Sequence, residues 1–194
     1  GWANLGLHAI DKDKARPYTN YGYKSEDEVP YQWTEFGNEC KNIKEFITKN
    51  FKAKKYYRIK ANLLHPKTLI NAHTDSRKKG LGLTEHSPYN DPDPYKIKYV
   101  WIALDWPKEV IFNVGNYRLP IKNGDIFLMN FGMTHEVYHP GKKIRSGIVL
   151  TADFTDSKEW EKLVCDSYVK NKNIILPKKK SLLIPKIKKR LSNF

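Results

Sequence analysis

The sequence predicts a mainly β domain, either a sandwich or a barrel, with helices on its flanks. Short stretches of alternating apolar and polar residues recur along the chain, and Gly, Asn and Pro turns separate them at regular spacing. Aromatic residues are abundant, with 12 Tyr, 8 Phe and 5 Trp, which favours a folded, β-rich body. A chain of 194 residues is long enough for one domain with a full core. We place this domain at residues 1–170, with its core at 55–155.

The N-terminal quarter is expected to flank the main sheet. Partial alternation at 5–10 predicts a strand. Residues 34–51 have apolar positions at helical spacing on one face, from Phe36 to Ile47, and Thr34 or Asn38 can cap the start of the helix. We expect this helix to buttress the sheet and to carry no chemistry.

Strand patterns begin at Lys55 and continue almost to the end of the domain. The expected strands are 57–63, 69–75, 98–104, 110–114, 126–129, 135–138 and 144–154, of which 126–129 resembles a buried strand. Residues 156–170 return to a helical pattern. Between the expected strands 69–75 and 98–104, residues 76–95 are rich in Gly and Pro. Such a long loop predicts either a lid over a site or a flexible insertion.

The charge of the chain is strongly positive and uneven. Its formal net charge is +14, and the segment from Lys170 to Arg190 has no acidic residue. A basic tail at 171–194 could attract an anionic partner such as nucleic acid or the ribosome, although a merely solvated tail is the simpler alternative. Cys40 and Cys165 form no recognisable framework, which predicts a reducing, cytoplasmic location, and no apolar run reaches the roughly 20 residues of a membrane span.

Two histidines and one aspartate predict a metal site. In a strand, His73 and Asp75 point to the same face, because residues two apart share a side of the sheet. His135 opens a later strand and can supply the third ligand. Two histidines and a carboxylate form the facial triad that holds Fe(II) and leaves coordination positions open for a cosubstrate and O₂.

Arg145 follows ten residues after His135 and can bind a carboxylate with two parallel hydrogen bonds. Together with the three metal ligands, it predicts an Fe(II)- and 2-oxoglutarate-dependent oxygenase. A cupin-like barrel that binds a metal or a sugar without catalysis is the alternative from the residues alone.

Two segments and this arginine resemble the aspartyl/asparaginyl β-hydroxylase family of 2-oxoglutarate oxygenases. The segments are NLLHPKTLINAH at 62–73 and THEV at 134–137. The resemblance covers roughly 57–154 and implies a double-stranded β-helix (a jelly roll) with His73 and His135 as iron ligands. It also implies that Arg145 pairs with the C5 carboxylate of 2-oxoglutarate and that Asn62 is a polar contact to that cosubstrate.

The chain departs from the animal members of that family at two places. Those enzymes bind iron through two histidines alone, whereas this chain has Asp75 in the carboxylate position. They also carry Arg and His on the strand that here contains Tyr99 and Trp101. We therefore treat Tyr99 and Trp101 as candidate pocket residues, and the substrate of the animal enzymes does not transfer directly.

The predicted reaction is hydroxylation of a C–H bond in a free amino acid, a peptide or protein side chain, or a small metabolite. The basic charge suggests a nucleic-acid oxygenase as an alternative, but the second arginine expected in such enzymes is missing from 146–154. The remaining histidines, His8, His65, His86 and His139, lack partners at ligand spacing. Glu136 would point away from its neighbour His135, so a supporting or surface role is expected.

Overall fold

The computed structural model describes residues 1–11, 18–74, 97–128 and 133–179. Its strands are β1 (Trp2–Ala9), β2 (Gln32–Trp33), β3 (Lys55–Leu64), β4 (Thr68–His73), β5 (Ile97–Asp105), β6 (Ile111–Val114), β7 (Tyr117–Arg118), β8 (Ile126–Leu128), β9 (His135–His139) and β10 (Arg145–Asp153). Its helices are α1 (Glu35–Glu39), α2 (Lys41–Asn50) and α3 (Lys158–Asn171), with short 3-10 helices η1 (Tyr18–Tyr21) and η2 (Glu26–Glu28).

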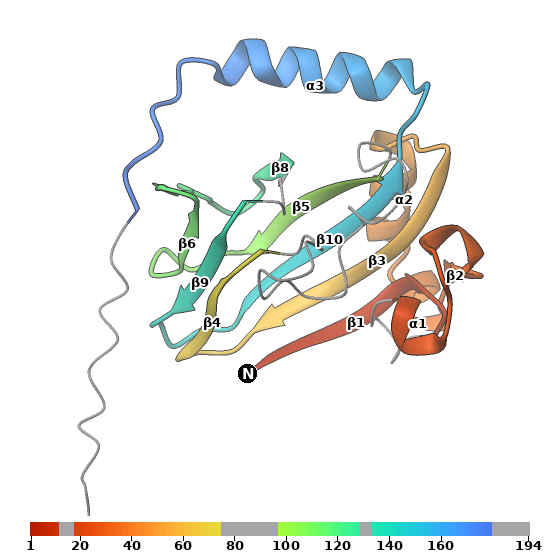
Figure 1. Ribbon diagram of the computed structural model, residues 1–194, viewed down its shortest axis with the longest axis horizontal. Helices are drawn as coiled ribbons and strands as arrows, with labels where there is room; N and C mark the ends of the chain where they lie inside the picture. The colour runs from red at the N-terminus through yellow and green to blue at the C-terminus, as the bar shows by residue number, and fades with distance from the viewer. Residues whose placement is uncertain (12–17, 75–96, 129–132, 180–194) are drawn as a thin grey trace, which may run out of the picture.

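The strands form two sheets that face each other (Figure 1). The larger sheet has the order β2-β1-β3-β10-β5-β8, and the smaller has the order β4-β9-β6-β7. From β3 to β10 the chain changes sheet at almost every step, and only β6 and β7 follow one another within a sheet. This eight-strand arrangement is a double-stranded β-helix, extended at one edge by β1 and β2. The predicted mainly β fold is confirmed.

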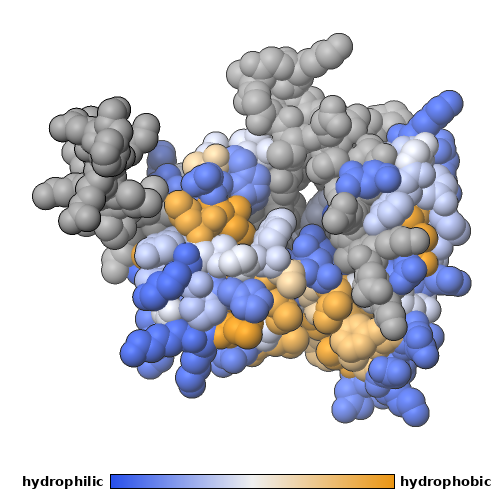
Figure 2. Space-filling model, turned by 90° about the horizontal axis from the view of Figure 1, so that it is seen from below, coloured by the Kyte–Doolittle hydropathy of each residue, from blue (hydrophilic) through white to orange (hydrophobic). Residues whose placement is uncertain are grey.

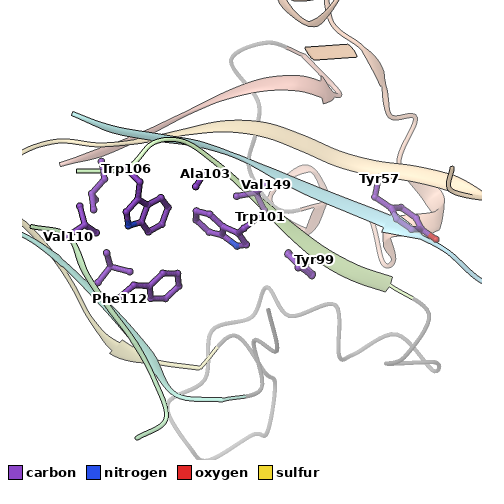
Figure 3. Packing of buried hydrophobic residues seen from close by; sticks show 10 residues of the cluster. Tyr57, Tyr99, Trp101, Ala103, Trp106, Val110, Phe112 and Val149 are labelled. Carbon is purple, nitrogen blue, oxygen red and sulfur yellow. The ribbon is translucent and has the colours of Figure 1, made fainter. Parts of the chain in front are cut away.

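Two apolar cores hold these layers together. The inner core fills the space between the sheets with aromatic rings, among them Trp101, Trp106 and Phe112 (Figure 3). The outer core lies on the opposite face of the larger sheet, where Ile47 of α2 packs with Ile59, Ile148 and other aliphatic residues. The central strands β3, β5 and β10 of the larger sheet are therefore buried on both faces, and only the inner face looks toward the smaller sheet.

The helix expected at 34–51 is interrupted. Thr34 caps its start as predicted, since its Oγ1 accepts a hydrogen bond from the backbone N–H of Gly37 at 3.0 Å. At Cys40 the backbone leaves the helical region, with φ −79° and ψ 52°, so α1 and α2 are separate helices. Of the predicted apolar face, Ile47 is fully buried, whereas Phe46 is exposed.

Two strand predictions need correction. Alternation along the strand expected at 57–63 predicts that Tyr57 and Ile59 share one face. The pairing register shifts between them, so Tyr57 joins the inner core and Ile59 the outer one. The strand at 126–129 was expected to be buried. Instead, Ile126 and Leu128 are about half exposed, because β8 is an edge strand that pairs only with β5.

The C-terminal region begins with α3, none of whose residues is buried. Its first turn is attached to the body by the Trp160 ring, which stacks on Phe154 with centroids 4.0 Å apart. Further on, the chain returns to the edge of the smaller sheet. The backbone N–H of Arg118 donates to the carbonyl of Pro177, and that of Lys179 donates to Asn116, both at 2.8 Å. The start of the expected tail is thus attached to β7.

The loop at 76–95 lies outside the described residues, and so does the rest of the tail from residue 180. Their predicted roles as a lid and as a contact for an anionic partner therefore stay predictions. Among the described helices, none is both long and apolar enough to cross a lipid bilayer.

Candidate functional site

The two predicted histidine ligands meet on the smaller sheet. The last residue of β4 is His73 and the first of β9 is His135, and the antiparallel register puts them directly opposite each other. Their ring centroids are 4.2 Å apart. With metal–nitrogen bonds of about 2.1 Å, two imidazoles at this separation can bind one ion in neighbouring positions. His135 is buried and faces the inner core, with its ring 6.5 Å from that of Phe112.

The hydrogen bonds of both rings favour the tautomer that a metal requires. His73 Nδ1 lies 2.6 Å from the carbonyl oxygen of Asn71, and His135 Nδ1 lies 3.0 Å from that of Met133. A carbonyl only accepts, so each Nδ1 carries the proton and donates it. The lone pair of each ring is then on Nε2, and the backbone fixes the orientation of the ring.

The predicted third ligand, Asp75, lies outside the described residues. Strand β4 ends at His73, and the description of this segment stops at Thr74. Within the described residues, no three His, Cys, Asp or Glu side chains gather in a way that could hold a metal. The histidine pair is therefore the part of the triad whose geometry is known.

Arg145 is a buried cation at the start of β10. Its side chain is only 1% exposed. Nη2 donates a hydrogen bond to Asn62 Oδ1, while Nε and Nη1 have no acceptor among the described residues. The loss of hydration on burial lowers the pKa of Arg145 to about 10, which still leaves the guanidinium charged at neutral pH. An isolated buried charge costs several kcal/mol, so this group is suited to an anion that arrives from solution.

Two tryptophans form the apolar surface against which the guanidinium lies. Arg145 Cζ is 4.7 Å from the ring centroid of Trp106 and 5.3 Å from that of Trp101. Such cation–π contacts stabilise a charge without neutralising it. Trp101 Nε1 is also buried without an acceptor in the described part of the chain. It is a second donor that a ligand could satisfy.

The other two predicted pocket residues, Tyr99 and Asn62, lie on β5 and β3 of the larger sheet. Tyr99 lies on the same inner face of β5 as Trp101 and is buried. Asn62 lies on β3, and its Nδ2 donates to Asn4 Oδ1 at 2.8 Å. Its carbonyl oxygen is already engaged by Arg145.

The histidine pair and Arg145 share one interior. A chain of aromatic contacts connects them. The Arg145 guanidinium lies against Trp106, the Trp106 ring stacks with Phe112 at 6.2 Å, and Phe112 contacts the ring of His135. Figure 3 shows Trp106, Trp101 and Phe112 side by side between the two sheets.

Glu136 faces away from the histidine pair, as expected. Partial burial acts to raise the pKa of this carboxyl, but hydrogen bonds from Lys179 and Asn113 outweigh it and hold the pKa below its ordinary value. Lys179 Nζ lies 2.7 Å from Glu136 Oε1. Glu136 therefore links β9 to the C-terminal segment.

Two of the histidines for which no ligand role is expected are buried in strands. His139 is the last residue of β9, where its Nε2 bonds to the carbonyl oxygen of Lys143. His8 lies on β1 with its Nδ1 2.6 Å from the carbonyl oxygen of Tyr57. Both have structural environments away from the pair.

Sequence reasoning missed Trp106 and Asn4. The alternation of Tyr99, Trp101 and Ala103 would leave Trp106 on the outer face. A register shift where Ser146 pairs with Asp105 and Gly147 with Ala103 turns it inward. Asn4 reaches the site because it pairs with Asn62 across β1 and β3. No local sequence pattern announces either contact.

Most of the chain matches one known protein family. The sequence profile of the aspartyl/asparaginyl beta-hydroxylase family matches residues 2–156. The chain belongs to this family. The match spans β1 to β10, so it includes both histidines and Arg145, and it identifies the protein as a member of a hydroxylase family.

Solved structures with a similar fold are distant. A predicted oxalate decarboxylase from Thermotoga maritima is 14% identical, over 57% of this chain and 73% of that one, with a TM-score of 0.34. A cupin 2 conserved barrel protein from Salinispora arenicola is 14% identical, over 56% and 71%, with a TM-score of 0.32. An RmlC-like cupin from Methanocaldococcus jannaschii is 12% identical, over 53% and 74%, with a TM-score of 0.34. A search of curated proteins returned no match.

Proposed function

We propose that this hydroxylase is an Fe(II)- and 2-oxoglutarate-dependent dioxygenase. It would hydroxylate a C–H bond of its substrate, which would be an amino acid or a side chain of a peptide or protein. The observation that carries this proposal is the buried guanidinium of Arg145, which no described carboxylate neutralises and which shares an interior with the His73–His135 pair. A metal site alone needs no such cation, whereas a keto-acid with a second carboxylate needs one at its far end.

The residues fit the proposed groups. His73 and His135 would hold Fe(II) through Nε2, with Asp75 as the third ligand on the basis of its position two residues after His73. Arg145 would bind the distal carboxylate of 2-oxoglutarate, and Trp101 Nε1 could donate to the same ligand. When bound, the iron and cosubstrate would supply the activation of O₂ that the side chains themselves cannot perform.

The protein would contribute position and exclusion of water. The inner-core rings around Arg145 keep the cation out of bulk solvent, which strengthens its attraction for a carboxylate. The backbone carbonyls of Asn71 and Met133 would hold the imidazoles with Nδ1 protonated and Nε2 available to the metal. Tyr99 would line the pocket farther along β5.

Two other functions are less well supported by the described residues. A nucleic-acid oxygenase is suggested by the net charge of +14, but much of the basic excess is in the C-terminal region, away from the histidine pair in sequence. A cupin-like module that only binds a metal or a sugar would not explain the buried Arg145, because neither ligand needs a cation that binds a dicarboxylate. The binding module is an outcome that the test below can detect, because it would bind a metal without releasing succinate.

The proposed cellular setting is the cytoplasm. Cys40 and Cys165 are both free thiols, which fits a reducing compartment. An anionic partner for the basic tail remains part of the proposal, through long-range attraction rather than a shaped site.

The direct test is turnover of 2-oxoglutarate. Anaerobic protein is loaded with Fe(II) and 2-oxoglutarate, exposed to O₂, and assayed for succinate without a second substrate. We expect slow succinate release that disappears in His73→Ala and His135→Ala. His139→Ala serves as a matched control for loss of an imidazole from β9, provided its fold is verified. Full turnover in the His135 variant would refute the metal assignment, and metal binding without succinate would favour the binding module.

The role of Asp75 needs its own variant. Asp75→Ala should weaken Fe(II) binding if the chain uses the full triad. If affinity and turnover are unchanged, the site works with two histidines, as in the animal members of the family.

A further inference from the structure

The side chain that anchors Arg145 is neutral, which is unusual for a buried cation. Buried arginines ordinarily pair with carboxylates, because an unpaired charge is costly to bury. Here the acceptor is the amide oxygen of Asn62, and no carboxylate pairs with Arg145 among the described residues. Asn62 is itself only 1% exposed, so bulk water does not reach this contact to solvate the cation.

The orientation of the Asn62 amide is fixed from its other end. Since Arg145 only donates, Asn62 must present Oδ1 to it and turn Nδ2 the other way. Nδ2 then donates to Asn4 Oδ1 at 2.8 Å. Asn4 is held directly opposite by the register of β1 and β3. The three side chains thus form a directed chain from β10 across β3 to β1.

We propose that Asn4 and Asn62 are positioning residues that orient the Arg145 guanidinium and preserve its positive charge for the distal carboxylate of the cosubstrate. The inference rests on the proposed function and names what makes Arg145 selective for a dicarboxylate. A carboxylate at position 62 would orient the arginine equally well. It would also neutralise the charge and compete with the incoming ligand.

This account makes an unusual prediction for Asn62→Asp. The new carboxylate should pair with Arg145, so thermal stability is kept or increased. Affinity for 2-oxoglutarate should nevertheless fall by about a hundredfold, since a charged partner of the arginine interacts more strongly than a neutral one. Asn62→Ala should lose about tenfold and Asn4→Ala a smaller factor, because these remove orientation but not charge.

The experiment is calorimetric titration of 2-oxoglutarate into anaerobic Fe(II)-loaded protein, with thermal unfolding of each variant in parallel. Asn50→Asp at the exposed end of α2 is the matched control for the same chemical change. Titration with 2-oxobutyrate, which lacks the distal carboxylate, should be nearly unaffected by Asn62→Asp. Asn4→Ala keeps the test informative if the Asn62 variants fail to fold.

Separate outcomes refute the two levels of the argument. If the unaltered protein binds 2-oxoglutarate and Asn62→Asp binds it equally well, the positioning role is wrong and the proposed function stands. Equal losses for 2-oxoglutarate and 2-oxobutyrate would also refute it, because the effect would not lie at the distal carboxylate. If the unaltered protein binds no 2-oxoglutarate, the proposed function fails and this inference fails with it.

Discussion

At the residue scale, the proposed site depends on the guanidinium of Arg145, which no described carboxylate neutralises. Trp101 and Trp106 stabilise the cation through their ring faces, and Asn62 accepts one of its hydrogens. Each of these contacts is compatible with a second, negatively charged ligand. The shape of the guanidinium matters as well as its charge, because it can present two parallel N–H groups to one carboxylate.

Replacing Arg145 by Lys tests that requirement. The charge is kept, but the planar fork and its contacts with two tryptophans are lost. We expect the KM for 2-oxoglutarate to rise by at least about tenfold, with Fe(II) affinity little changed. Steady-state succinate assays at saturating iron measure this. Arg118→Lys on β7 is the control, and an unchanged KM for the Arg145 variant would argue against the carboxylate contact.

His8 gives a pH-dependent prediction. Burial lowers the pKa of His8 below its ordinary value of 6.5, although the bond to the Tyr57 carbonyl acts to raise it. The unfolded chain therefore binds a proton more readily than the native protein as the pH falls through this range. The stability that neutral His8 provides is present above about pH 6.5 and is lost as the pH decreases toward the lower, native pKa.

The measurement compares His8→Asn with the unaltered protein. The Asn amide can still donate to the Tyr57 carbonyl but does not titrate. Between about pH 7.5 and 5.5, the free energy of unfolding should fall less in the variant than in the parent. Parallel pH profiles would show that His8 does not contribute to the acid sensitivity.

The nearness of His73 and His135 could be predicted from sequence, because each lies at the end of a predicted strand, while their role as metal ligands stays a prediction. The pairing of His73 with His135 followed from two strand ends, and the structure brings them together. Trp106 and Asn4 could not be predicted in this way. Their positions depend on a register shift and on a strand pairing between distant segments, which no local pattern encodes.

At the element scale, close packing of α1 against β1 supports the outer layer. Gly37 lies in α1, and a Cβ built on it would be 2.0 Å from the carbonyl oxygen of Leu7. The obstacle is a backbone carbonyl that already accepts a hydrogen bond from the backbone N–H of Thr34 at 3.0 Å, so moving it away would break that bond. Only glycine fits at this contact.

Gly37→Ala should therefore destabilise the protein strongly. We expect a loss of about 3 kcal/mol or more in the free energy of unfolding, since the helix must move off the strand. Denaturant unfolding gives this value, and Glu35→Ala at an exposed position of the same helix is the control. A loss below about 1 kcal/mol would mean that α1 shifts at little cost.

Element boundaries show the limits of periodicity. The apolar spacing of 34–51 is helical throughout, yet the chain changes direction at Cys40. The strand β8 has an apolar sequence, but its place at the sheet edge leaves two of its three residues half exposed. In both cases the element type was predicted correctly, while its surroundings depend on how the layers assemble.

At the scale of the whole molecule, the double-stranded β-helix places the histidine pair and Arg145 in one interior. β10 supplies the cation from the larger sheet, and β4 with β9 supplies the imidazoles from the smaller one. The surface is more hydrophilic than this aromatic interior. Figure 2 shows hydrophilic residues along the lower and right-hand margins of one face, with apolar patches between them.

The C-terminal segment is predicted to support the smaller sheet without forming part of the site. A chain ending at Asn171 would lose the backbone bonds to β7 and the contact between Lys179 and Glu136. We expect it to be less stable by about 1–2 kcal/mol, because few bonds are lost and the ion pair is partly exposed. Its 2-oxoglutarate affinity should be unchanged, and calorimetry of the shortened chain checks this. A chain that no longer folds would extend the domain beyond residue 170.

The measurement that tests the central claim most directly is the coupling between Fe(II) and 2-oxoglutarate. If the histidine pair and Arg145 form one site, each ligand must tighten the binding of the other by the same factor. Anaerobic titrations should show 2-oxoglutarate binding at least about tenfold more tightly with Fe(II) than without it. His135→Ala should abolish this enhancement. Equal affinity with and without iron would contradict the account, because the cation and the imidazoles would then serve separate sites.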